Sequence, residues 1–336
     1  MRASTRLTRA AALVGAVALL TASLAGCSAI PGFGGCTPAF TSGATSSIVT
    51  ATGKIGRTPD VDFPTPLVVS EPEVSRIEVG DGPAVKRDGQ VDYAVTYYNG
   101  ETGELLGATG YGSIDSDDPP ARSAVGLDDY AISDAFECVS VGDRLALAST
   151  AGQAFGEGEA GIPDDTVLVL VIDVLDTFLG KADGFNQLPQ DGMPVVVTAV
   201  DGTPAISVTG VQKPESTRVA TIKGGDGVTA RDGDTVHVHV RVWTWPVSGT
   251  DEPEQFADTW ADRRQSYDMI LADDATNPIP PGVLDAVRGA KVGSQLLIVI
   301  PPGPDSYATP PQGLDADSTM IWVVDILGTQ KTDSAK

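Results

Sequence analysis

Short segments in which apolar and polar residues alternate dominate the chain after its first fifty or so residues. Two clear examples are VDYAVTYY, which begins at Val91, and TVHVHVRVWTW, which begins at Thr235. Alternation places every second side chain on the same face of an extended strand. Clusters of Gly, Pro and Asp separate these segments, as turns do. The pattern predicts antiparallel strands.

One segment has the spacing of a short helix instead. Leu284 and Val287 lie three residues apart, Pro281 suits a first helical turn, and Gly289 follows. The corresponding stretch in the first half of the chain, Tyr130 to Cys138, has a less regular helical pattern. The predicted fold class is therefore α+β, with antiparallel strands wrapped around one short helix.

The chain also repeats itself. Gly80-Asp81-Gly82 recurs as Gly225-Asp226-Gly227, and TVLVLVIDVLD from Thr166 matches STMIWVVDILG from Ser318. Self-similarity of this kind indicates two copies of one structural unit. We call residues 75–176 the first repeat and residues 218–328 the second repeat. The segments before both repeats also resemble each other, so each unit is expected to begin with an extended arm.

The N-terminus has the pattern of a signal peptide, in which arginines precede an uncharged apolar run that ends near Ala25. The run ends in Leu24-Ala25-Gly26-Cys27, which resembles the bacterial lipobox. This resemblance implies that Cys27 becomes a lipidated mature N-terminus on the extracytoplasmic face of a cell membrane. Secretion with an incidental cysteine at this position is the alternative.

These features divide the chain into five parts. The predicted parts are a signal peptide (1–26), a flexible tether (27–48), a degenerate N-terminal domain with its arm (49–176), a linker (177–193) and a C-terminal domain with its arm (194–330).

The remaining cysteines, Cys36 and Cys138, form an even pair in an oxidising compartment. We predict a disulfide between them, and two unrelated free thiols are the alternative. The formal net charge is −23. A chain with this excess of acidic residues lacks the basic surface that nucleic acid requires, so no nucleic-acid partner is expected. The oligomeric state is left open, with a monomer as the expectation.

The order of landmarks resembles that of the FKBP-type peptidyl-prolyl cis-trans isomerases, in an arrangement similar to tandem-domain lipoproteins of the actinobacterial type. The likeness is strongest in NPIPPGVLDAVRGAKVGSQLLIVIPP, residues 277–302, and in QAFGEGEAGIPDDTVLVLVIDVLD, residues 153–176. It implies two tandem FKBP-like domains that act on proline-containing exported proteins.

The activity that the resemblance implies needs no metal, nucleophile or cofactor, and none is expected. Amide resonance gives a rotation barrier of about 18 to 20 kcal/mol. A twisted amide loses its charge separation, so an apolar cavity lined by aromatic rings favours the twisted state over the planar one.

The resemblance also implies a pocket in the second repeat. Its expected lining is Phe256, Tyr267, Ile279, Tyr307, Trp322, Val240 and Val283. Val283 stands where the family has a tryptophan floor, and Ala257 replaces an aspartate. Pro280 aligns with the residue whose backbone N–H binds family ligands, and proline has none, so Ile279 is the candidate donor. Ordinary core packing is the alternative for the aromatic residues.

In the first repeat the same alignment places Thr96 at the strand tyrosine, Ile132 at the floor, Phe155 at the loop tyrosine and Val169 at the last-strand aromatic. This pocket is expected to keep too few of the family's pocket residues to catalyse isomerisation. The tryptophans of the chain, which are Trp243, Trp245, Trp260 and Trp322, all lie in the second half. The second repeat is therefore the expected working unit.

His237 and His239 share one face of a strand, but no third metal ligand is specified, and we expect them to be structural. The leading hypothesis is a membrane-anchored prolyl isomerase or folding factor. The competing hypothesis is a non-catalytic FKBP-fold chaperone or protein-binding lipoprotein.

Overall fold

The computed structural model describes residues 36–111, 120–126, 130–246, 252–261, 266–272 and 277–331. Cys27 and the predicted signal peptide lie outside these residues. Among the residues that the model describes, no helix is both long and apolar enough to span a bilayer. Cys36 and Cys138 are both disulfide-bonded, as the predicted bridge requires.

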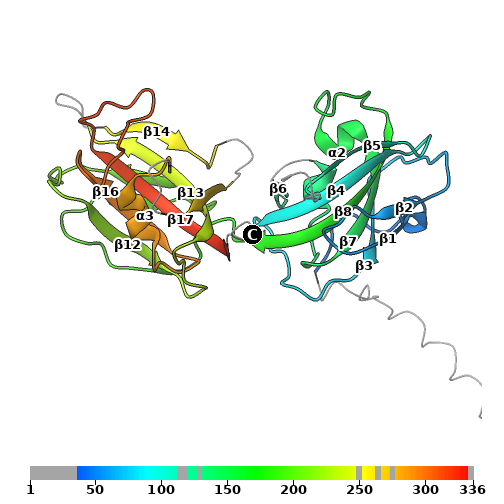
Figure 1. The fold of residues 1–336 in the computed structure, drawn as a ribbon, viewed down its shortest axis with the longest axis horizontal. Helices are drawn as coiled ribbons and strands as arrows, with labels where there is room; N and C mark the ends of the chain where they lie inside the picture. Colours follow the sequence, from blue (N-terminus) through cyan, green and yellow to red (C-terminus); the bar gives the residue numbers. More distant parts are fainter. Residues whose placement is uncertain are drawn as a thin grey trace, which may run out of the picture. The chain divides into compact units, whose positions relative to one another are not determined.

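The first repeat folds into an antiparallel sheet with the strand order β3-β7-β8-β4-β5, in which β6 also pairs with β4 (Figure 1). Its strands are β3 (Glu73–Glu78), β4 (Gln90–Asn99), β5 (Leu105–Thr109), β6 (Ala121–Ala124), β7 (Arg144–Thr150) and β8 (Val167–Phe178). The alternating segment from Val91 thus forms β4, as predicted. Two short helices, α1 (Ala131–Asp134) and α2 (Ala151–Phe155), accompany this sheet.

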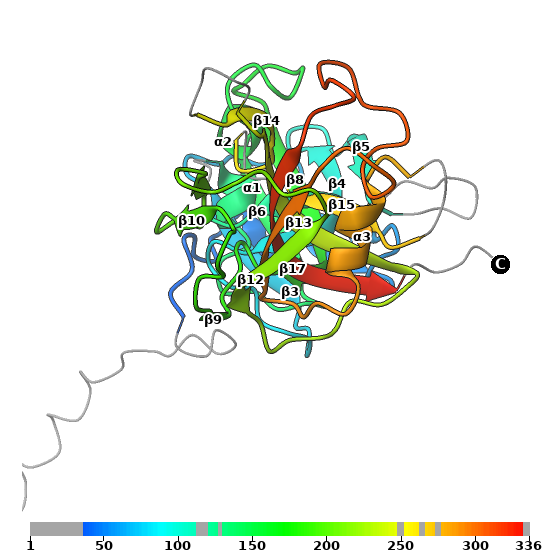
Figure 2. The same cartoon turned by 90° about the vertical axis from the view of Figure 1, so that its left-hand side faces the viewer.

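The second repeat has the same strand order, β12-β16-β17-β13-β14, with β15 paired to β13 and β9 added beside β12. Its strands are β9 (Phe185–Asn186), β12 (Arg218–Gly224), β13 (Asp234–Thr244), β14 (Glu254–Asp258), β15 (Tyr267–Ile270), β16 (Gln295–Ile300) and β17 (Met320–Lys331). Helix α3 (Pro281–Val287), labelled in Figure 2, begins at the proline that suits a first turn. It packs on β16 (Figure 1). The predicted α+β class, with sheets wrapped around short helices, is confirmed.

Each lead-in arm forms a two-stranded hairpin. The first hairpin consists of β1 (Thr50–Thr52) and β2 (Asp60–Asp62), preceded by the 3-10 helix η1 (Ser46–Ile48), and the second consists of β10 (Val195–Thr198) and β11 (Pro204–Ser207). Arm residues pack against one face of the sheet, as Val61 does against the buried cluster that includes Val169 and Val171. The other face of the first sheet packs against the helices.

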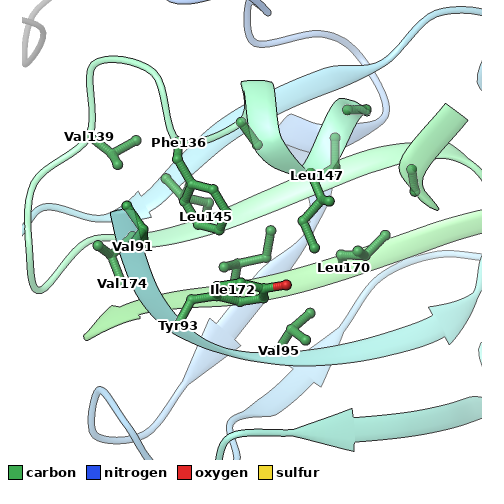
Figure 3. Packing of buried hydrophobic residues seen from close by; sticks show 14 of the residues in the cluster. Val91, Tyr93, Val95, Phe136, Val139, Leu145, Leu147, Leu170, Ile172 and Val174 are labelled. Carbon is green, nitrogen blue, oxygen red and sulfur yellow. The ribbon is translucent and has the colours of Figure 1, made fainter. Parts of the chain in front are cut away.

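The helix side of the first sheet holds the main core of the first repeat. Figure 3 shows side chains from β4, β7 and β8 gathered with Phe136 in this layer. Tyr93 packs against Phe136 with ring centroids 4.9 Å apart. Alternation along β4 and β8 thus sends one set of apolar side chains to this core and the other set to the arm.

Candidate functional site

A cavity of about 550 Å³ opens on the helix side of the first sheet. Strands β4, β5, β6 and β8 contribute to its walls, together with α1, the end of α2 and the loop that follows α2. Its lining includes Tyr93, Val95, Tyr97, Leu106, Arg122, Tyr130, Ile132, Phe155, Glu159, Ile162 and Leu168. Three tyrosines and a phenylalanine therefore surround a space of the size that small ligands occupy.

Alternation along β4 delivers the first part of this lining. Tyr93, Val95 and Tyr97 point to the cavity, because they lie two residues apart on one strand face. Burial raises the pKa of Tyr93 to about 12, so its hydroxyl stays protonated at neutral pH. Tyr97 and Phe155 meet edge to face, with ring centroids 6.3 Å apart.

A capping box positions Phe155 at the end of α2. The backbone N–H of Gln153 donates to Thr150 Oγ1 at 3.4 Å, and the Thr150 N–H donates to Gln153 Oε1 at 3.1 Å. Gly156 follows with φ +101°, and a Cβ there would lie 2.7 Å from the Tyr130 ring. Only glycine suits both conditions, so Gly156 lets Tyr130 approach this side of the cavity.

Arg122 contributes a guanidinium whose charge is matched within the same sheet. Its Nε donates to Asp92 Oδ1 at 2.6 Å and its Nη2 donates to Asp92 Oδ2 at 2.9 Å. Arg122 lies on β6 and Asp92 on β4, directly opposite each other in the register of the two strands. The bidentate pair fixes the wall of the cavity at this point.

Two assignments for the first repeat are wrong. Thr96 was expected at the strand tyrosine position, but it is fully buried and lies outside the cavity lining, between Val95 and Tyr97, which do line it. Val169 was expected at the last-strand aromatic, but it packs toward the arm, while Leu168 and Leu170 face the core. Each assignment is wrong by one residue, and a shift of one residue along a strand moves the side chain to the opposite face of the sheet. Ile132 and Phe155 do line the cavity.

The structure gathers most of the residues predicted in the second repeat. Val240, Val283 and Trp322 are buried in one cluster, and Phe256, Ile279 and Tyr307 pack against it half-buried. Tyr267 is 38% exposed and lies outside this cluster. Burial raises the pKa of Tyr307 to about 12, and the nearby Tyr267 adds to this rise.

Both histidines have partners within the second repeat. His237 Nδ1 lies 2.7 Å from Asp268 Oδ1, and His239 Nδ1 lies 2.9 Å from Thr259 Oγ1. The His239 ring also stacks on Trp260, with centroids 4.4 Å apart. These contacts give both side chains a structural role.

Sequence reasoning missed Tyr93, Tyr97 and Tyr130. The signal for the first two was present, because VDYAVTYY places Tyr93, Val95 and Tyr97 at a period of two. Tyr130 carried no such signal, since only the approach to Gly156, 26 positions later in the chain, brings it to the cavity.

Comparisons with known proteins found similarity at the level of structure. No protein-family model and no curated protein matches the chain. The three FKBP domains of wheat FKBP73 align at 17% identity with a TM-score of 0.30, covering 78% of this chain and 95% of that one. FkpA from Escherichia coli aligns at 22% identity with a TM-score of 0.29, covering 42% and 53%.

A third structure is described as the peptidyl-prolyl cis-trans isomerase FKBP12 from Mycobacterium tuberculosis. It aligns at 30% identity with a TM-score of 0.25, covering 35% of this chain and 88% of that one. Solved structures of FKBP proteins are thus among those to which this chain is similar.

Proposed function

We propose that this protein is an FKBP-type folding factor that binds proline-containing segments of exported proteins, with the cavity of the first repeat as a peptide site. The observation that carries the proposal is the cavity itself, a space of about 550 Å³ walled by Tyr93, Tyr97, Tyr130 and Phe155. Aromatic walls present flat apolar surface to a pyrrolidine ring and exclude water from its amide.

The same environment favours isomerisation. A planar prolyl amide carries separated charge that water stabilises, and the twisted amide carries less. The aromatic wall of the cavity therefore stabilises the planar amide less than water does, which lowers the barrier. The tyrosine hydroxyls of the lining offer hydrogen bonds to the neighbouring peptide groups.

The second repeat is proposed as a second peptide site. Its support is the gathering of Phe256, Tyr307 and Trp322 around one cluster, with Val283 at the floor position. The tryptophans that favoured this repeat in the sequence do not all lie in one cluster. Trp322 joins this cluster, but Trp243 packs in the arm cluster on the other side of the sheet.

A non-catalytic binding module is the second candidate. Both floor positions are aliphatic, Ile132 in the first repeat and Val283 in the second. An aliphatic floor offers less flat surface to hold a proline ring than an indole does. This favours binding over fast isomerisation, and a measurement of both quantities on one protein separates the two candidates.

Phe155 and Tyr307 make a matched pair for this test, since they occupy corresponding places in the two repeats. In the full chain, we expect Phe155→Ala to weaken binding of an Ala-Pro peptide by roughly tenfold, and Tyr307→Ala to weaken it less. Calorimetry gives the affinity, and a protease-free assay gives the isomerisation rate. Unchanged affinity in Phe155→Ala would refute the first-repeat site, and binding without any rate above background would establish the non-catalytic module.

We further propose anchoring through Cys27 on the extracytoplasmic face of the membrane. Its support is the signal-peptide pattern and the Leu24–Cys27 lipobox in the sequence. Several acyl chains on one residue give stable attachment, whereas one chain holds only marginally. We expect Cys27→Ser to abolish labelling by radioactive palmitate and to leave the signal peptide attached, which raises the apparent mass on a gel. Palmitate labelling of this variant equal to that of the unmodified chain would contradict the proposal.

A further inference from the structure

The hydroxyl of Tyr93 makes no hydrogen bond to any residue that the structure describes. Its side chain is only 9% exposed, and it lines the first-repeat cavity. A tyrosine that is buried to this degree usually has a hydrogen-bond partner, because an unpaired hydroxyl in apolar surroundings costs free energy. A donor without a partner in a cavity of this size indicates a ligand that brings an acceptor.

The cavity has an aromatic end and a polar end. Tyr97 and Phe155 meet at the aromatic end, where β4 approaches α2. Tyr93 lies four residues earlier on the same strand, opposite Ala121 of β6, so the polar end lies beside β6 and α1. Four residues of an extended strand span about 13 Å. The lining therefore extends along β4 farther than one pyrrolidine ring reaches, and a neighbouring peptide group has room beside the ring.

The other donors at the polar end already have acceptors within the protein. Ser133 Oγ donates to the Ala124 carbonyl at 2.7 Å, and Ser123 Oγ donates to the same carbonyl at 3.2 Å. Arg122 is engaged in the bidentate ion pair described above. Of the donors described at this end, Tyr93 is therefore the one that can serve a ligand without breaking a bond inside the protein.

The ring of Tyr93 is held in a fixed position. It packs against Phe136 with ring centroids 4.9 Å apart and an interplanar angle of 47°. Figure 3 shows the Tyr93 hydroxyl directed away from Val91 and along β4 toward Val95, which also lines the cavity. Because burial raises the pKa of Tyr93 to about 12, the hydroxyl keeps its proton at neutral pH and can donate it.

We infer that the Tyr93 hydroxyl donates to the carbonyl oxygen of the proline residue itself, and so determines the specificity of the cavity for proline within a continuing peptide chain. This inference rests on the proposed peptide-binding function and deepens it. The ring occupies the aromatic end, and the carbonyl that follows the ring lies toward the polar end. A ligand without this carbonyl leaves the buried hydroxyl unpaired and binds more weakly.

The choice between the two carbonyls beside a proline ring follows from amide resonance. The oxygen of the residue before proline carries the negative charge of the planar amide. A donor at that oxygen would stabilise the planar state and oppose the isomerisation that the aromatic walls favour. A donor at the carbonyl after the ring holds the segment in place without this effect.

Two ligands test the assignment in the full chain: acetyl-Ala-Pro-N-methylamide and acetyl-Ala-pyrrolidide. The second ligand keeps the ring and the amide before it but has no carbonyl after it. We expect Tyr93→Phe to weaken binding of the first ligand by roughly fivefold and to change the affinity for the pyrrolidide less than twofold. Calorimetry measures both affinities. All chains carry Tyr307→Ala, which reduces binding by the second repeat.

Tyr98→Phe is the matched control. It removes a hydroxyl from the same strand, but Tyr98 lies outside the cavity lining and packs edge to face against Phe63, with ring centroids 5.9 Å apart. We expect this variant to keep both affinities. Circular dichroism verifies that both variants are folded.

The remaining outcomes separate this inference from the proposed function. If Tyr93→Phe weakens both ligands equally, or weakens neither, the contact with the proline carbonyl is refuted and the peptide-binding function stands. If neither ligand binds to the chain with Tyr93 intact, the proposed first-repeat site fails and the inference fails with it.

Discussion

Replacing Arg144 by alanine is expected to destabilise the first repeat by about 3 to 5 kcal/mol. Arg144 and Asp173 are both fully buried, and two hydrogen bonds of 2.6 and 2.8 Å join them. The guanidinium also donates to the carbonyls of Gly53 and Lys54, at 3.0 and 3.2 Å. Asp173 in turn accepts the Gly56 N–H at 2.8 Å. The variant leaves a buried carboxylate without its cation.

Urea denaturation followed by circular dichroism and by tryptophan fluorescence shows which repeat loses stability. Circular dichroism reports both repeats, whereas tryptophan fluorescence reports the second, since all four tryptophans lie in the second half of the chain. We expect the loss of stability to appear in the circular dichroism curve and not in the fluorescence curve. The double variant Arg144→Met with Asp173→Leu removes both charges and should recover part of the loss. A loss below about 1 kcal/mol in Arg144→Ala would mean that water enters to solvate Asp173.

The corresponding pair of the second repeat is expected to make its stability fall as the pH rises. Gln295 and Asp325 stand opposite each other on β16 and β17, just as Arg144 and Asp173 do on β7 and β8. Gln295 Nε2 donates to Asp325 Oδ1 at 2.8 Å, and the Ala182 N–H donates to Oδ2 at 2.8 Å. A neutral amide thus replaces the guanidinium.

Burial raises the pKa of Asp325 from 3.8 to about 6, although the Ala182 N–H, Gln295 and Lys223 act in the opposite direction. The folded state therefore binds this proton more tightly than the unfolded state does. Its stabilising effect is complete below pH 4 and is lost as the pH rises toward 6. A difference of about two pKa units corresponds to about 3 kcal/mol.

Asp325→Asn tests this expectation by removing the titrating group while keeping its shape. Unfolding free energies from tryptophan fluorescence should fall between pH 4 and 6.5 in the unmodified chain, and this step should disappear in the variant. Gln295→Arg is the matched control, because it copies the pair of the first repeat and should lower the pKa of Asp325. A fall of equal size in the unfolding free energy of Asp325→Asn would assign the pH dependence to other carboxylates.

Much of the fold was predictable from local pattern. Alternation identified β4 and β13, and the repeated landmarks indicated two units that share one strand order. Pro281 marked the start of α3 because proline lacks only an N–H that the first helical turn leaves unpaired. The arms were predicted as extended, but their folding into hairpins against the sheets depends on partners far away in the chain.

The site was less predictable, for a physical reason that Thr96 and Val169 illustrate. An alignment that is wrong by one position changes little in a sequence comparison, yet in a strand it moves a side chain to the opposite face. The alternation of Tyr93, Val95 and Tyr97 placed these three residues together correctly. It did not say which face of the sheet would carry the cavity.

The sequence by itself determined the strands, the repeat and the acidic balance, and it carries the resemblance to a lipobox at Cys27, because each depends on residues close together in the chain or on composition. Only the tertiary structure decided that four aromatic side chains leave a cavity in the first repeat. It also paired Arg144 with Asp173 and Gln295 with Asp325. Cavities and buried pairs depend on which distant side chains meet and how completely they fill the space between them, and local pattern does not record either.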